Sequence, residues 1–355
     1  MSEVPVTDII GKLRNPRTEQ IREGLVALCK ATQKDEVRAQ VREAGGIPLV
    51  IQALSHESGD IRQQALKVLC NLSFDDMNIQ VIRELDGIGP IIGCLYQGAE
   101  HENVHMSRFS LRALCNLSID DEAKAEIREL GGLRPIVEFC ASEDVKAKRD
   151  ALRSLCNLSI DAENKMEFRP IGGIPAVVSC LQSDDIEVVR YALACLINLS
   201  ADEKNEEEIR QYKGLEAVLR CLRNEDVDTR RFALRLLCNL AINPENKHEI
   251  GRLRGLEDVF ACLSVQDIEL QCYALATLMH LCVDDRNNQA IRTLGLIESV
   301  INLLDADTVD EVKRYAVGAL TIFCADDRNL SLFVQQNGFK AVSALVVTKD
   351  QRCRR

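Results

Sequence analysis

The sequence predicts an all-α protein, a superhelical solenoid in which one helical unit recurs about every 41 residues. Three separate sequence marks recur at this step, and their agreement is the evidence for a repeat. The asparagines of a recurring Leu-Cys-Asn-Leu-Ser phrase and its variants are 45, 41, 41 and 41 residues apart: Asn71, Asn116, Asn157, Asn198 and Asn239. Glycines keep the same step at Gly46, Gly87, Gly132, Gly173, Gly214 and Gly255, and cysteines nearly so at Cys94, Cys140, Cys180, Cys221 and Cys262.

Each unit contains three predicted helices. The first is short, as in residues 122–130, and the acids that follow each Leu-Ser pair supply its N-cap and first-turn carboxylates. The second, as in residues 44–55, begins at a glycine break and carries proline early, where the missing N–H costs nothing. The third, as in residues 59–73, places five apolar residues on one face at helical spacing: Ile61, Ala65, Leu66, Leu69 and Leu72. One unit cannot bury its apolar surface alone, so neighbouring units are expected to stack into a continuous core.

The composition indicates a reduced protein with a closely packed helical core. Aromatic residues make up only 4% of the chain and tryptophan is absent, so Leu, Ile, Val, Ala and Cys must fill the interior. The 15 cysteines include no Cys-x-x-Cys motif and mostly fall in two recurring registers, which indicates packing and not metal binding or redox chemistry. Because no basic-then-apolar leader is found at the N-terminus, we expect a cytoplasmic location, with the nucleus also open.

Charge and hydropathy limit the classes of partner. The formal net charge of −11 argues against general nucleic-acid binding. No apolar run approaches the length of a membrane span, so direct membrane insertion is not expected. We expect a monomer that needs no cofactor or metal.

The repeated phrases resemble those of a known family. Units that begin Gly-Gly-Ile-Pro, as at 45–48, and later carry Ala-Leu-x-x-Leu-Cys-Asn-Leu-Ser, as at 65–73, are similar to armadillo repeats. The resemblance covers about residues 5–349 and implies a single domain, a right-handed superhelix of seven full units between two partial ones. Residues 350–355 would then form a short basic tail. In armadillo proteins the third helix lines a concave groove.

Positions four and eight residues before each asparagine lie near the same face of the third helix, and basic residues dominate them in the middle of the array. They are Lys67, Arg108, Arg112, Arg149, Arg153, Arg190, Arg231 and Arg235. No Asp or Glu occupies these registers, and Arg binds carboxylates and phosphates, often with two hydrogen bonds. These residues are therefore predicted to bind an acidic, or phosphorylated, ligand.

The five asparagines are predicted to bind the backbone of the same ligand. An amide can pair with both the C=O and the N–H of an extended chain. Asn116 also has no evident packing role within its apolar phrase. In importin-α-type armadillo proteins a tryptophan lies one turn before the asparagine, and that position here holds Lys67 or Arg112. The pattern is more similar to the β-catenin type, which implies acidic extended partners.

The sequence thus predicts a non-catalytic scaffold or adaptor that binds extended acidic protein segments. The alternative is a regulator of a small GTPase, or a chaperone-like cofactor, acting through a broad armadillo surface. Residues 101–105 spell His-Glu-x-x-His, a zinc-protease motif, but no third ligand follows at a recognisable spacing. The motif falls where one unit gains four residues, so residues 95–107 are expected to form a surface insertion loop, and residues 96–100 to be irregular.

Overall fold

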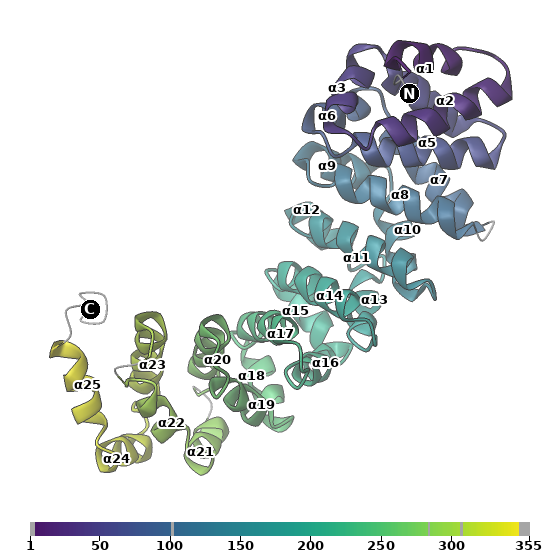
Figure 1. The fold of residues 1–355 in the computed structure, drawn as a ribbon. Coiled ribbons are helices and arrows are strands. Elements are labelled where there is room, and N and C mark those ends of the chain that lie inside the picture. Colours follow the sequence, from purple (N-terminus) through teal and green to yellow (C-terminus); the bar gives the residue numbers. More distant parts are fainter. Residues whose placement is uncertain (1–3, 101–102, 283–284, 306–307, 348–355) are drawn as a thin grey trace. The chain divides into compact units, whose positions relative to one another are not determined.

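The computed structural model describes residues 4–100, 103–282, 285–305 and 308–347, which form helices joined by short turns without any strand (Figure 1). The chain divides into two compact units, Met1–Cys180 and Leu181–Arg355. The predicted all-α fold is confirmed. Within the described ranges, no helix has the length and apolar character needed to cross a membrane. The predicted basic tail lies outside the described residues.

The helices of Met1–Cys180 recur as a short first helix, a second helix and a longer third helix. They are α1 (Val6–Leu13), α2 (Thr18–Ala31), α3 (Asp35–Glu43), α4 (Gly46–Gln52), η1 (Ala53–Ser55), α5 (Gly59–Leu72), α6 (Asp76–Glu84), α7 (Ile88–Glu100), α8 (Val104–Leu117), α9 (Asp121–Glu129), α10 (Leu133–Glu138), η2 (Phe139–Ala141), α11 (Val145–Leu158), α12 (Ala162–Glu167) and α13 (Gly173–Cys180). Helices α1 and α2 correspond to the second and third helices of a repeat, and they precede the first complete triplet, α3 to α5.

The helices of Leu181–Arg355 follow the same order, starting with a third helix. They are α14 (Ile186–Leu199), α15 (Glu203–Gln211), α16 (Gly214–Cys221), α17 (Val227–Leu240), α18 (Pro244–Arg252), α19 (Gly255–Leu263), α20 (Ile268–Leu281), α21 (Asp285–Thr293), α22 (Leu296–Asn302), α23 (Asp310–Phe323), α24 (Asp327–Gln335) and α25 (Gly338–Val347).

Aspartate side chains begin several of the first helices. Asp75 accepts a hydrogen bond of 2.9 Å from the backbone N–H of Asn78, three residues later. Asp120 and Asp161 accept the equivalent bonds, each of 2.8 Å, at α9 and α12. These carboxylates satisfy N–H groups that the helix itself leaves unpaired, which fixes the starting residue. The prediction that acids after Leu-Ser begin the next helix is confirmed at these three sites.

The third helices form the layer that positions the candidate site. Helices α2, α5, α8 and α11 contact one another in sequence within Met1–Cys180, and α14, α17, α20 and α23 do so within Leu181–Arg355 (Figure 1). On α5 all five predicted core residues, Ile61, Ala65, Leu66, Leu69 and Leu72, are fully buried. The stacking of helices thus removes from water the apolar face that one unit would leave exposed.

The expected irregular segment at residues 96–100 is helical, so that prediction is wrong. Helix α7 continues to Glu100, and α8 begins at Val104 after the N-cap Asn103. A Cβ atom added at Gly98 would lie 2.5 Å from Oγ of Ser107 and 2.9 Å from its backbone nitrogen. Glycine is therefore present for close packing of α7 on α8 and does not break the helix. His101 lies outside the described residues, and His105 is exposed on α8.

Candidate functional site

The predicted asparagines occupy equivalent positions in the last turn of successive third helices. Asn71, Asn116 and Asn157 lie on α5, α8 and α11 of Met1–Cys180, and Asn198 and Asn239 lie on α14 and α17 of Leu181–Arg355. Asn116 is only 8% exposed, and the other four are half-buried.

The amide nitrogens of three asparagines bond the preceding third helix in Met1–Cys180. Each Nδ2 donates both to a backbone carbonyl and to a hydroxyl, at distances of 3.0 to 3.2 Å: Asn71 to Cys29 O and Thr32 Oγ1, Asn116 to Cys70 O and Ser73 Oγ, and Asn157 to Cys115 O and Ser118 Oγ. A carbonyl oxygen can only accept, which fixes the orientation of each amide. The expectation that Asn116 has no packing role is therefore wrong. Its Oδ1, by contrast, accepts no hydrogen bond from the described residues.

The hydroxyl partner is a sequence signal that becomes visible only when neighbouring repeats are compared. Asn239 of the second unit donates to Ser200 Oγ at 3.1 Å, as its counterparts do. In the next repeat the hydroxyl position holds Ala241, and the asparagine position holds His280. Where the hydroxyl is absent, the asparagine is absent too. A pairing between repeats predicts this, since an amide without its hydroxyl acceptor loses half of its hydrogen bonds.

Three predicted cations of Met1–Cys180 have no carboxylate partner among the described residues. Lys67 on α5 lies over the ring of Phe109, with Nζ 5.1 Å from the ring centroid. Arg112 on α8 makes no hydrogen bond or ion pair there, and Nε of Arg108 is buried without an acceptor. These three side chains, together with exposed Lys30 on α2, leave net positive charge on the third-helix face, the surface formed by α2, α5, α8 and α11.

One carboxylate lies among these cations. Asp150 on α11 is 9% exposed, and burial raises its pKa while the nearby Arg112, Arg108 and Arg153 act in the opposite direction. Asp150 was not among the predicted residues, because it lies seven residues before Asn157 and not four or eight. Asp150 therefore compensates part of the positive charge without forming a direct ion pair with Arg108 or Arg112. Of the other predicted cations on α11, Arg149 is half-buried and Arg153 exposed.

In Leu181–Arg355 two predicted cations are already paired. Arg190 on α14 donates from Nε to Asp226 Oδ2 at 2.9 Å and lies 3.2 Å from Asp228. The Arg190 hydrogen bond lowers the pKa of Asp226 to about 2. Each of these aspartates comes from the start of the next third helix, a region that the registers did not include.

Arg231 on α17 is paired in the same way. Its Nε donates to Asp267 Oδ1 at 3.1 Å, and its Nη1 donates to Asp228 at 2.9 Å. The hydrogen bond from Arg231 lowers the pKa of Asp267, and the carboxylates raise the pKa of Arg231. Arg235, one turn further on, is exposed and has no ion pair among the described residues.

A second network joins neighbouring first helices. Arg42 on α3 donates from Nη1 to Asp75 Oδ1 at 2.7 Å and to Asn78 Oδ1 at 2.8 Å, and Asn78 Nδ2 donates to Leu72 O. Arg128 makes the same two bonds to Asp161 and Asn164. The signal in the sequence is an Asp followed three residues later by Asn. Because these bonds join neighbouring repeats, the network stabilises repeat stacking.

Most cysteine side chains of the described residues are buried packing groups. Burial raises the pKa of Cys70 to about 12 and that of Cys94 to about 11, so both remain thiols near neutral pH. Cys180 differs, because a hydrogen bond with Cys140 lowers its pKa despite burial. In the part of the chain that the structure describes, no three His, Cys, Asp or Glu side chains come together as a metal site.

Comparisons with known proteins agree with this architecture. The family model described as armadillo/beta-catenin-like repeat matches residues 34–74 and 120–160, and the model described as kinesin-associated protein matches residues 180–354. No curated protein sequence matches the chain.

Two solved structures illustrate the likeness in fold. The crystal structure of an engineered protein has a TM-score of 0.79 at 21% identity, covering 99% of this chain and 96% of that one. A computationally designed armadillo repeat protein for modular peptide recognition has a TM-score of 0.63 at 17% identity, covering 66% of this chain and 99% of that one. The family-model match shows armadillo repeats at residues 34–74 and 120–160, and the solved structures show that the chain has an armadillo-type fold.

Proposed function

We propose that this protein is a non-catalytic scaffold that binds an extended acidic segment along the third-helix face of Met1–Cys180. The observation that carries the proposal is the set of cations without a carboxylate partner among the described residues, Lys67, Arg108 and Arg112. A cation already paired within the protein gains little from a ligand carboxylate, whereas an unpaired one gains a new ion pair.

The spacing of the helices suits an extended ligand. Packed helices lie roughly 8–10 Å apart, and an extended chain rises about 3.3 Å per residue. Lys67 and Arg112 hold equivalent positions on α5 and α8. The two cations would therefore face ligand residues that are about three positions apart. The Oδ1 atoms of Asn71, Asn116 and Asn157 supply acceptors for backbone N–H groups. The likeness to a designed armadillo protein for modular peptide recognition favours such a ligand.

Arg190 and Arg231 contribute less to this proposal than the sequence alone suggested. Both donate to aspartates of the following repeat, so their charge is largely compensated before any ligand arrives. Arg149, Arg153 and Arg235 remain predicted ligand contacts.

The test removes the three charges and keeps polar side chains. A variant carrying Lys67→Gln, Arg108→Gln and Arg112→Gln is titrated with a labelled twelve-residue peptide of alternating Glu and Ala, and binding is followed by fluorescence anisotropy. We expect Kd to rise roughly tenfold or more, because each exposed ion pair contributes about 0.2–1 kcal/mol. Binding by the parent protein should also weaken as salt is raised.

The matched control removes the same charge elsewhere in the same unit. Arg14, Arg17 and Arg134 are exposed and have no ion pair among the described residues, so their joint change to Gln should leave Kd within twofold. Equal affinity of the parent and the Lys67, Arg108 and Arg112 variant would show that the proposed site is wrong. Circular dichroism melting of each variant checks that the fold is retained.

A further inference from the structure

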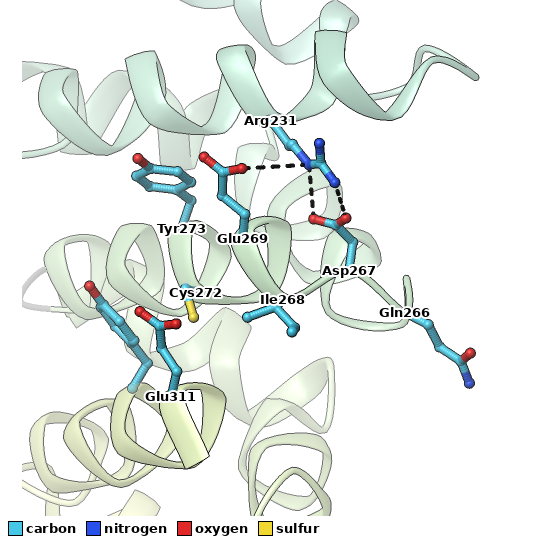
Figure 2. Close-up of a pocket in the computed structure, with 9 residues that line it drawn as sticks. Arg231, Gln266, Asp267, Ile268, Glu269, Cys272, Tyr273 and Glu311 are labelled. Carbon is cyan, nitrogen blue, oxygen red and sulfur yellow. Dashed lines mark hydrogen bonds and ion pairs between the residues drawn. The ribbon is translucent and has the colours of Figure 1, made fainter. Parts of the chain in front are cut away.

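A cavity of about 590 Å³ lies on the third helices of Leu181–Arg355, between α17, α20 and α23 (Figure 2). Its lining contains carboxylates, two tyrosines and one cysteine, and differs in sign from the third-helix face of Met1–Cys180. The lining residues are Arg231, Gln266, Asp267, Ile268, Glu269, Cys272, Tyr273, Glu311 and Tyr315.

The charge of the α20–α23 cavity is negative. The lining contains one cation, Arg231, and three carboxylates. The shortest contacts of Arg231 go to Asp267 and to Asp228. Glu269 lies 3.8 Å from Arg231 Nε, and its side chain is 57% exposed. Glu311 lies 3.5 Å from Arg314 on its own helix and is 56% exposed. Each glutamate thus has one long ion pair, and more than half of its side chain is exposed to a ligand.

The remaining lining suits an aliphatic chain that ends in a cation. Figure 2 shows the ring of Tyr273 beside Glu269 on α20, and Glu311 of α23 directed toward Cys272. Tyr273 presents an aromatic ring whose face attracts ammonium and guanidinium groups, whereas the guanidinium of Arg314 already lies 5.5 Å from the ring centroid of Tyr315. Cys272, which is 8% exposed, offers a nonpolar contact for methylene groups.

We propose that the α20–α23 cavity binds a lysine or arginine side chain of an extended protein segment. The charged end lies between Glu269 and Glu311, and its methylene chain contacts Tyr273, Tyr315 and Cys272. The lining carboxylates repel an acidic segment, so this site is distinct in specificity from the one proposed on Met1–Cys180 and does not depend on it. The described residues form no metal-binding group there, which favours an organic cation over a metal ion.

The probe is a labelled peptide, Gly-Gly-Lys-Gly-Gly-Lys-Gly-Gly, whose lysines are about 10 Å apart when extended, the spacing of neighbouring helices. We expect the full chain to bind it and to bind a norleucine version, which keeps the carbon chain without the charge, at least fivefold more weakly. The double variant Glu269→Gln/Glu311→Gln should weaken binding of the lysine peptide roughly fivefold to tenfold. Tyr273→Leu/Tyr315→Leu should weaken it about threefold.

The control variant is Glu203→Gln/Glu207→Gln, which removes two exposed carboxylates of α15 in the same unit. It should leave the affinity for the lysine peptide within twofold. The proposal is wrong if the lysine and norleucine peptides bind equally or if neither binds. It is also wrong if the two glutamate variants lose the same affinity for the lysine peptide. Thermal melting of the variants shows whether each retains its fold, and the Tyr273 and Tyr315 variant gives an independent reading of the same site.

Discussion

The amide of Asn116 is nearly buried and donates to Cys70 O and Ser73 Oγ of the preceding third helix. Asn116→Ala leaves the carbonyl without its donor, so we expect the free energy of unfolding to fall by about 1–3 kcal/mol. Ser73→Ala should cost less, since the carbonyl bond remains. In a double-mutant cycle followed by urea denaturation, a coupling of about 0.5–1.5 kcal/mol is expected. Purely additive losses would contradict the pairing.

The position of these asparagines could be predicted from the sequence, whereas their bonds could not be predicted from one helix alone. Counting four and eight residues back identifies side chains on a common face, but the acceptors come from the preceding repeat. The same limit applies to Arg190 and Arg231, whose aspartates lie 36 residues later in the chain. A search for residues that change together between neighbouring repeats, such as Ala241 with His280, would have indicated the amide pairing.

The Arg190–Asp226 pair predicts a pH dependence of stability. Because the folded state lowers the pKa of Asp226 to about 2 from 3.8, the pair stabilises the fold above pH 4, and this stabilisation is lost as pH falls toward 2. Arg190→Met should lower stability at pH 7 and lose less stability between pH 4 and 2 than the parent. Urea denaturation at a series of pH values measures the difference. Parallel pH profiles of the two proteins would show that Arg190 does not lower the pKa of Asp226.

At the scale of the helix, two glycines of α7 give opposite predictions. A Cβ at Gly98 would contact Ser107 of α8 at 2.5 Å, whereas nothing lies within 4 Å of a Cβ at Gly93. Gly98→Ala should therefore destabilise the protein by about 1–3 kcal/mol through overpacking. Gly93→Ala should stabilise it by about 0.5–1 kcal/mol, since alanine favours helix. Thermal denaturation of both variants checks this, and an equal effect of the two changes would argue against close packing of α7 on α8.

Most helices were predictable because apolar spacing, N-cap aspartates and glycine breaks agree within each unit. Residues 59–73 were expected as a third helix, and α5 spans Gly59–Leu72. The end of α7 was not predictable from local preference. A segment of Tyr, Gln, Gly, Ala and Glu usually indicates a turn, but here contact with α8 stabilises it as helix and requires the small residue. Tertiary packing overrides propensity at this point.

At the scale of the whole molecule, the net charge of −11 conceals two surfaces of opposite local sign, the third-helix face of Met1–Cys180 and the lining of the α20–α23 cavity. On Met1–Cys180 the cations Lys67, Arg108 and Arg112 lack carboxylate partners among the described residues. On Leu181–Arg355 the cations Arg190 and Arg231 are paired, and Glu269 and Glu311 are exposed. The positions four and eight residues before each asparagine do not distinguish paired from unpaired arginines. The carboxylates that pair with them come from the next repeat and lie outside these positions. We therefore predict two binding sites with opposite preference for ligand charge.

The most direct test titrates the acidic and the lysine peptide against three full-length proteins at 0.15 M salt, where screening acts beyond about 8 Å. The proteins are the parent, the Lys67, Arg108 and Arg112 to Gln variant, and Glu269→Gln/Glu311→Gln. We expect the first variant to lose affinity only for the acidic peptide and the second only for the lysine peptide. If both variants weaken both peptides equally, or neither changes any Kd, the claim of two sites with opposite charge preference is wrong.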